Sequence, residues 1–260
     1  MYIDYEVAEK IATITLNRPE AANAQNTEFL DELDAAWTRA AEDPEVAVII
    51  LRANGKHFSA GHDIRGGGHV PDKITLEFLV QHEQRRYLEY TLKWRNTPKP
   101  SIAAVQGRCI SGGLLLCWPC DLILAADDAL FSDPVVLMGI GGVEYHGHTW
   151  ELGPRKAKEI LFTGRAMTAD EVAATGMVNK VVPRDQLDAE TRTLAAQIAK
   201  MPTFALRQAK RAVNQTLDVQ GFYAAIQSVF DIHQTGHGNA LSVGGWPVLV
   251  NLDEMKANIQ

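Results

Sequence analysis

The chain has 260 residues, of which 46% are hydrophobic and 22% charged, a composition typical of a globular protein with one sizeable core. Its 25 lysines and arginines against 32 aspartates and glutamates give a net charge of −7, which argues against a nucleic-acid-binding surface. No apolar run approaches the roughly 20 residues of a membrane span, so we expect neither nucleic acid nor a membrane as a partner.

The cysteines and the first residues bear on the cellular compartment. Three cysteines at uneven spacing favour free thiols over a disulfide framework. The N-terminal residues carry no basic stretch followed by an apolar one, so we expect no secretion signal. Together these features predict a cytoplasmic protein.

The first part of the chain is expected to alternate between strands and helices. Apolar residues alternate with threonines over 12–16, which predicts a half-buried strand, and helical spacing of apolar residues predicts a helix over 27–42. The continuous apolar run 46–51 suits a strand buried on both faces. A polar loop with glycines at 66–68, expected to be flexible, precedes a long helix over 72–94.

The second part of the chain changes from strands to helices. Three short strands are predicted, at 102–105, 122–125 and 129–131, with a short apolar helix opened by Gly112 and Gly113. Further helices are predicted from Pro154, over 187–198, from Pro202 and over 222–233. No linker divides the chain, so we expect one continuous unit with a core over 1–200 and a helical oligomerisation region over 201–260.

Two loops rich in small residues share a design. Residues 58–64 follow one buried strand and residues 105–113 follow another. Small residues leave backbone N–H groups accessible, and two converging N–H groups form an oxyanion hole for charge that develops on a carbonyl oxygen. Taken singly, each loop is a weak signal, better explained as a tight turn at the end of a strand.

Taken together, these motifs resemble those of the crotonase (enoyl-CoA hydratase/isomerase) superfamily over nearly the whole chain. The matching segments are 17–24, 58–64, 107–113 with 120–122, 161–164 and 173–179. The resemblance implies an α/β fold, a spiral of ββα units followed by trimerising helices. It also implies an acyl-CoA thioester as substrate and assembly as a homotrimer or a dimer of trimers.

The resemblance also implies a set of binding residues. By similarity, the thioester oxygen lies between the amide N–H groups of Ala60 and Gly112, which makes an enolate-like intermediate accessible. The expected coenzyme A contacts are Ala22, Ala60, Gly61, His62, Asp63, Ile64 and Arg108, with Lys99 and Lys256 as further cations to test for the phosphates. No cofactor beyond the coenzyme A of the substrate and no metal ion is expected.

The chain departs from the family at the two positions where hydratases carry glutamates. These positions read Leu115 and Val135, and neither side chain can transfer a proton. We therefore expect an enzyme of this family, a lyase or isomerase, that is not an ordinary hydratase. His62 follows the first small-residue bend as in malonyl-type acyl-CoA decarboxylases of the superfamily, and it is a candidate catalytic donor.

Several other side chains could replace the missing glutamates. Tyr145 and His146 are the leading candidates, Asp133 is another, and Glu144 and His148 share the same segment. The alternative for this segment is a solvated loop or a subunit contact. The alternatives for the whole protein are a malonyl-type decarboxylase and a non-catalytic acyl-CoA-binding protein.

Two patterns suggest other chemistry and are not favoured. Cys117 and Cys120 have the spacing of a redox dithiol, but they lie at the far end of an apolar helix, where packing explains them better. His146 and His148 have a spacing that also occurs by chance in proteins that bind no metal.

Overall fold

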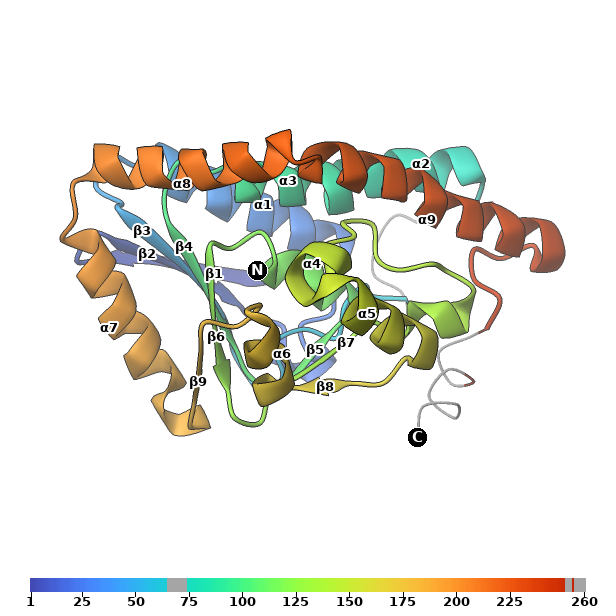
Figure 1. Cartoon of the computed structure of the whole chain (residues 1–260), viewed down its shortest axis with the longest axis horizontal. Coiled ribbons are helices and arrows are strands. Elements are labelled where there is room, and N and C mark those ends of the chain that lie inside the picture. Colours follow the sequence, from blue (N-terminus) through green and yellow to red (C-terminus); the bar gives the residue numbers. More distant parts are fainter. Residues whose placement is uncertain (65–73, 251–253, 255–260) are drawn as a thin grey trace.

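The computed structural model describes residues 1–64, 74–250 and 254, and within these residues the strands form two sheets. The larger sheet has the order β1-β2-β3-β4-β6-β9 (Figure 1). Its strands are β1 (Ile3–Ala8), β2 (Ile11–Leu16), β3 (Val48–Ala53), β4 (Ser101–Val105), β6 (Leu122–Ala126) and β9 (Lys180–Val182). Within this larger sheet, only β1 and β2 pair antiparallel, and the other neighbouring strands are parallel.

Both faces of the larger sheet are covered by helices. Ile49 and Leu51 of β3 belong to the hydrophobic core that includes α1 (Thr27–Glu42), whereas Val48 and Ile50 pack with α7 (Leu187–Ala199). Successive residues of a strand point to opposite faces, so a strand covered on both sides must be apolar throughout. Figure 1 shows α7 along one side of this sheet.

A smaller sheet carries the loops that build the site. Its order is β5-β7-β8, with β5 (Arg108–Ile110), β7 (Leu130–Ser132) and β8 (Met167–Thr168). The helical segments around it are η3 (Ser111–Gly113), α4 (Leu114–Cys117), η4 (Pro134–Met138), α5 (His148–Thr163) and α6 (Ala169–Thr175). The chain therefore passes from β5 directly into η3 and α4, at the second small-residue loop.

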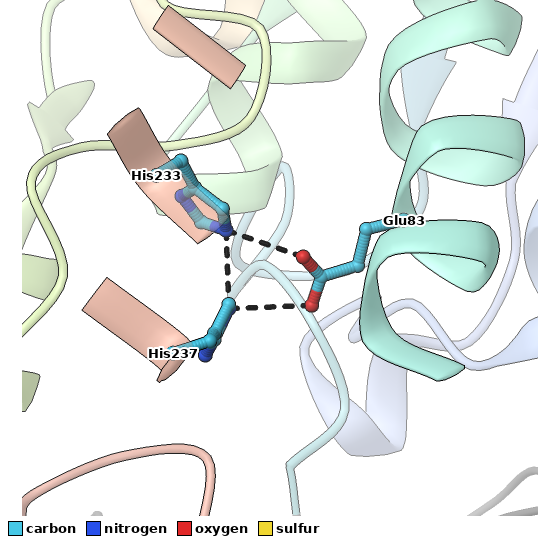
Figure 2. A group of neighbouring side chains, drawn as sticks. All are labelled: Glu83, His233 and His237. Carbon is cyan, nitrogen blue, oxygen red and sulfur yellow. Dashed lines mark hydrogen bonds and ion pairs between the residues drawn. The ribbon is translucent and has the colours of Figure 1, made fainter. Parts of the chain in front are cut away.

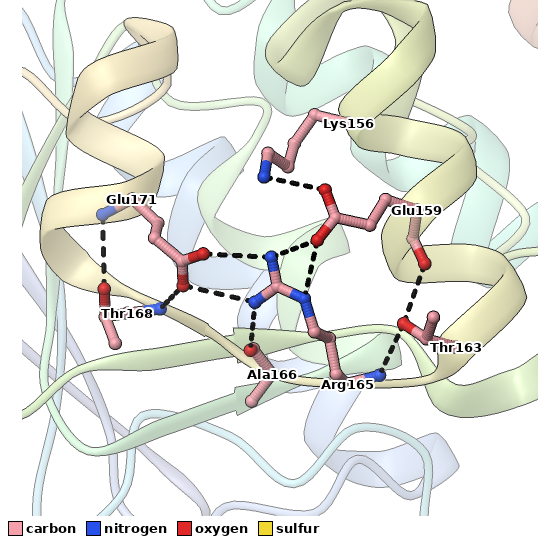
Figure 3. A network of polar contacts seen from close by, with 7 residues as sticks. All are labelled: Lys156, Glu159, Thr163, Arg165, Ala166, Thr168 and Glu171. Carbon is pink, nitrogen blue, oxygen red and sulfur yellow. Dashed lines mark hydrogen bonds and ion pairs between the residues drawn. The ribbon is translucent and has the colours of Figure 1, made fainter.

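Arg165 ties the end of α5 to the start of α6 (Figure 3). Its guanidinium contacts Glu159 of α5 and Glu171 of α6, the latter at 2.9 Å. Glu171 also accepts from the backbone N–H of Thr168, whose hydroxyl accepts from the N–H of Glu171, a reciprocal capping box. These contacts fix the turn that leads into α6.

The remaining helices form a layer along one side of the molecule. α2 (Leu76–Glu83), a π-helical segment (Gln84–Glu89) and α3 (Tyr90–Arg95) follow one another. α8 (Thr203–Val219) lies along the upper edge of the molecule in Figure 1, and α9 (Phe222–Gly244) continues from it to the right. α2 packs against α9. Two short 3₁₀ turns, η1 (Pro19–Ala21) and η5 (Arg184–Gln186), complete the described elements.

Most predicted elements are confirmed, but the long helix predicted over 72–94 begins at Leu76 and is divided by the π-helical segment, and the burial of one strand was misjudged. The helix over 27–42 coincides with α1, and the C-terminal helices start where Pro202 and Phe222 place them. The strand over 12–16 was expected to be half-buried, which is wrong, because Thr13 and Thr15 are also buried. The strands β1, β5, β8 and β9 and the helix α6 were not predicted. Glycines 66–68 and Lys256 lie outside the described residues. Within those residues, no helix is both long and apolar enough to cross a bilayer.

Candidate active site

Three segments of backbone converge at the candidate site. Gln25 forms a parallel bridge with His62, and Ser59 forms one with Cys109. The side-chain amide of Gln25 donates to the carbonyl of Gly112 at 2.8 Å. A Cβ on Gly61 would lie 2.7 Å from the carbonyl oxygen of Ile110 and 3.1 Å from the nitrogen of Gly112. Only glycine permits this approach, and its φ of +85° favours glycine as well.

The backbone amides of the first loop differ in what they donate to. The N–H of Ala60 donates to the carbonyl of Ala22 at 2.9 Å, and the N–H of Asp63 donates to the carbonyl of Gln25 at 2.9 Å. Within the described part of the chain, the N–H of His62 has no acceptor, and neither has that of Gly112 near the start of η3. The amide of Ala60, expected to be the first oxyanion donor, is therefore already occupied.

The imidazole of His62 lies over Gly112. A Cβ on Gly112 would lie 2.4 Å from Cδ2 of His62. The ring stacks on Tyr87 of the π-helical segment, with centroids 3.8 Å apart and an interplanar angle of 8°. Its Nδ1 lies 3.6 Å from Oε1 of Glu144. The imidazole of His62 is thus held over Gly112, whose amide N–H has no described acceptor.

Glu144 lies at the centre of a buried polar cluster. Its side chain is only 3% exposed, and Oε1 is 3.6 Å from Nδ1 of His62 and 3.6 Å from Nε2 of His233. Its second oxygen, Oε2, has no hydrogen-bond partner among the described atoms. A carboxylate buried with an unused oxygen is suited to accept or deliver a proton.

Glu83, His233 and His237 form a second group in contact with the first (Figure 2). One carboxylate oxygen of Glu83 lies 3.3 Å from Nε2 of His233, and the other lies 3.3 Å from Nε2 of His237. Burial opposes the ionisation of Glu83, but hydrogen bonds with the two histidines outweigh it and hold its pKa well below the usual range. Burial lowers the pKa of His233, but Glu144 and Glu83 outweigh it and raise that pKa to about 9.

Asp133 and His148 form a separate buried pair. Nε2 of His148 lies 2.9 Å from Oδ2 of Asp133, which also accepts from the N–H of Val143. Burial opposes ionisation of Asp133, yet His148 outweighs it and lowers the pKa of the carboxyl. His146 packs on His148 with ring centroids 4.3 Å apart, and burial lowers its pKa to about 4. His146 is therefore neutral at pH 7.

Comparison with known proteins identifies the fold. A family model described as Enoyl-CoA hydratase/isomerase matches residues 6–237. The chain belongs to the enoyl-CoA hydratase/isomerase family. The Mycobacterium tuberculosis protein named "Putative enoyl-CoA hydratase EchA13" is 45% identical, with 94% of this chain and 83% of that protein covered.

Two crystal structures, each of a protein titled a probable enoyl-CoA hydratase, are closely similar in fold. The one from Mycobacterium smegmatis is 84% identical with a TM-score of 0.94, covering 96% of this chain and 100% of its own. The one from Mycobacterium thermoresistibile is 85% identical with a TM-score of 0.93, covering 95% of this chain and 99% of its own. The expected α/β crotonase fold with a helical C-terminal region is thereby confirmed.

The expected catalytic residues fall in three different places: the converging loops, the buried group of Asp133 and His146, and the contact of Tyr145 with α9. His62 and Gly112 meet at the converging loops, and Glu144 joins them. Tyr145 does not: its ring packs on Phe222 of α9, and burial raises its pKa. Leu115 and Val135, which the resemblance implies stand where hydratases carry glutamates, lie in α4 and η4, buried and half-buried.

The expected coenzyme A contacts are partly rearranged. Lys99 is buried, and its Nζ donates to the carbonyls of Ala40 and Asp43, so the expectation that it meets a phosphate is wrong. Asp63 pairs with Arg18 at 2.7 Å, which fixes the end of the first loop. Ile64 is 50% exposed and Arg108 is exposed, so both remain accessible to a ligand.

The cysteines are packed in the core, as expected. All three are free and buried. The sulfur of Cys117 lies 3.9 Å from that of Cys109, whereas that of Cys120 faces the carbonyl of Leu116. Burial raises the pKa of Cys117 and Cys120, which is the opposite of a reactive thiol.

Glu83, Tyr87 and His237 were missed in the sequence. Glu83 and Tyr87 sit inside a helix predicted only from its apolar residues. His233 lies at the end of the helix predicted over 222–233, and no role was predicted for it. One signal was available: His233 and His237 are four residues apart, so on a helix they share a face.

Proposed function

We propose that this protein is an acyl-CoA enzyme that stabilises a thioester enolate through the amide N–H groups of His62 and Gly112. His62 replaces Ala60 in this role because the amide of Ala60 is bound to Ala22. Two such donors aimed at a developing oxyanion each contribute about 3–4 kcal/mol of transition-state stabilisation. No cofactor beyond the coenzyme A of the substrate enters this step.

Glu144 is the proposed acid and base, with His62 beside it. The observation that carries this proposal is the buried Glu144 carboxylate 3.6 Å from Nδ1 of His62, with one oxygen unused by the described atoms. A base near an enolate-stabilising hole can remove a proton from the carbon next to the thioester and return it elsewhere. The reaction class is therefore proton transfer on an acyl-CoA, as in isomerisation.

Ordinary hydration is disfavoured because the family's glutamate positions hold Leu115 and Val135. In hydratases of the family, two carboxylates at these positions hold the water, and here both side chains are hydrocarbon. The carboxylate of Glu144 belongs to a different segment of the chain. The relatives are named hydratases, so hydration by Glu144 is the competing outcome within the same family.

Decarboxylation is the second candidate, and one observation favours it. Nε2 of His62 is buried and has no partner among the described atoms, so it could hold a substrate carboxylate. The carboxylate of Glu144, 3.6 Å from Nδ1 of the same ring, would repel such an anion. We therefore rank proton transfer above loss of CO₂.

The test uses NMR in D₂O to follow the exchange of the substrate's proton on the carbon next to the thioester. The substrates are a panel of saturated, enoyl-, malonyl- and methylmalonyl-CoA thioesters. We expect exchange with the wild type and a loss of about 10²- to 10⁴-fold in Glu144→Gln. Glu151→Gln is the matched control, because the carboxyl of Glu151 is also shielded from solvent but has no described contact with His62.

Two results would contradict the proposal. One is hydration of crotonyl-CoA at an ordinary enzyme rate that Glu144→Gln leaves unchanged. The other is tight binding of these thioesters without exchange or turnover of any of them, which would favour a non-catalytic binding protein.

We also propose that the protein assembles as a homotrimer or a dimer of trimers. α8 has no buried residue, although Phe204, Val213 and Val219 on it are 72%, 62% and 78% exposed. A helix with exposed apolar side chains favours a subunit contact. Light scattering of the purified protein tests this, and a monomer at micromolar concentration would contradict it.

A further inference from the structure

We propose that Glu83, His233 and His237 form a binding site for a divalent transition-metal ion, with Zn²⁺ as the best match. The expectation from the sequence was that no metal is bound, so this inference departs from it. It is independent of the proposed reaction, because it concerns only whether the cluster binds an ion.

The spacing of the three side chains fits a tetrahedral ion. Nε2 of His233 and Nε2 of His237 are 3.1 Å apart, and each lies 3.3 Å from an oxygen of Glu83. Ligands bound to Zn²⁺ at roughly 2.0–2.1 Å are about 3.3–3.4 Å from one another in tetrahedral geometry. The three side chains are therefore close to tetrahedral ligand spacing. Because the two 3.3 Å distances involve different oxygens of Glu83, its carboxylate must turn to bring one oxygen to the ion or bind it through both.

The hydrogen bonds of the Nδ1 atoms of His233 and His237 determine which ring nitrogen of each histidine carries a lone pair. Nδ1 of His233 lies 2.7 Å from the carbonyl oxygen of Gly142, and Nδ1 of His237 lies 2.6 Å from that of Pro247. A carbonyl only accepts, so both Nδ1 atoms carry the hydrogen. In the neutral rings the two Nε2 lone pairs then face each other across 3.1 Å, and only a proton or a cation between them relieves the repulsion.

The surrounding charge favours a divalent ion over a single proton. Glu83 and Glu144 are both buried, and Glu144 Oε1 lies 3.6 Å from Nε2 of His233. Among the described residues, no lysine or arginine pairs with either carboxylate. One proton on His233 offsets one of the two negative charges, whereas Zn²⁺ offsets both.

The support around the ligands resembles that of known metal sites. Metal-binding histidines donate their second ring N–H to carbonyls, as both do here. The amide of Gln234 donates to Glu83 at 2.6 Å and fixes the carboxylate. His233 and His237 share one face of α9, and Glu83 ends α2 where the π-helical segment begins, so the ligands come from packed helices (Figure 2).

The experiment titrates metal-depleted protein with Zn²⁺ and Co²⁺ in the absence of any thioester. We expect one equivalent to bind, with the visible spectrum of four-coordinate Co²⁺. Glu83→Gln and His237→Asn should weaken binding by at least about 100-fold, the upper range for loss of an outer partner. His82→Asn is the matched control, since it removes the adjacent histidine outside the cluster and should leave binding unchanged.

A second measurement, on the wild type alone, tests the proposal even if the variants fail to fold. In the wild type, Zn²⁺ should shift the imidazole ¹⁵N resonances of His233 and His237 and release protons. Absence of binding at equimolar protein and metal, unchanged ¹⁵N resonances, or equal affinity in folded Glu83→Gln would overturn the proposal, and would assign a shared proton to the cluster instead.

Discussion

His62 lies flat against Tyr87, and this contact directs its Nδ1 toward Glu144. The ring centroids are 3.8 Å apart, Tyr87 is 9% exposed, and its own position is set by the π-helical segment between α2 and α3. The residue whose amide we assign to the oxyanion hole therefore has its side chain fixed from another part of the chain. A site assembled this way depends on packing as much as on the loop motif.

Replacing Tyr87 tests whether the stack positions His62. Tyr87→Phe keeps the ring and should retain activity, whereas Tyr87→Leu removes the flat surface and should lower kcat/KM by about 10- to 100-fold through misplacement of His62. Steady-state kinetics measure the effect, and circular dichroism verifies the fold. Equal activity in the two variants would mean that the stack does not orient the imidazole.

Substitution of Gly112 tests the close approach of the two loops. In Gly112→Ala the new Cβ would lie 2.4 Å from His62, so the ring and the adjacent amide must shift. We expect turnover to fall by 10²-fold or more, about the effect of losing one oxyanion donor. Gly141→Ala is the control, because a Cβ there meets no atom within 4 Å and should change little.

Because of His146, the free energy of unfolding should decrease as the pH falls below about 6.5. Burial lowers its pKa from 6.5 to about 4, so the unfolded chain takes up the proton first as the pH falls. The stabilisation is complete above pH 6.5 and is lost as the pH falls toward 4, by up to about 1.4 kcal/mol per pH unit.

The measurement is urea unfolding from pH 8 to pH 4 of the wild type and His146→Asn. The variant should lose part of the slope between pH 6.5 and 4. Identical slopes would show that His146 titrates normally in the folded protein.

Lys99 is expected to stabilise the fold without binding ligand. Its ammonium donates to the carbonyls of Ala40 and Asp43 at the end of α1, so Lys99→Met should cost about 1–3 kcal/mol of unfolding free energy. Calorimetry should show unchanged coenzyme A affinity. The exposed Lys93→Met should cost less than about 0.5 kcal/mol, and a loss of coenzyme A binding in Lys99→Met would restore the phosphate role.

Helices and strands could be predicted from the sequence where apolar residues recur at a clear spacing or where proline or glycine marks the ends. α1 was predicted from one apolar face, and in the structure the side chain of Asn26 caps it by accepting from the N–H of Phe29. β2 was misjudged because Thr13 and Thr15 alternate with apolar residues as on an exposed face. In the folded chain both faces are covered, and tertiary packing overrides the local pattern.

The site was only partly predictable, for a related reason. The small-residue motifs located the loops, but Gly61, Ala60 and His62 are adjacent, and only the bridge to Gln25 shows which amide points outward. Tyr145 and Glu144 are neighbours in sequence, yet one faces Phe222 and the other His62. Glu83 and His233 meet across 150 positions of chain, a contact that no local pattern indicates.

The most direct test is a crystal structure with a non-reactive acyl-CoA analogue. The account predicts a thioester oxygen about 2.7–3.1 Å from the amide nitrogens of both His62 and Gly112, with Glu144 the nearest carboxylate to the adjacent carbon. A thioester oxygen bound elsewhere, or a carbon chain with Glu144 out of hydrogen-bond reach, would contradict it.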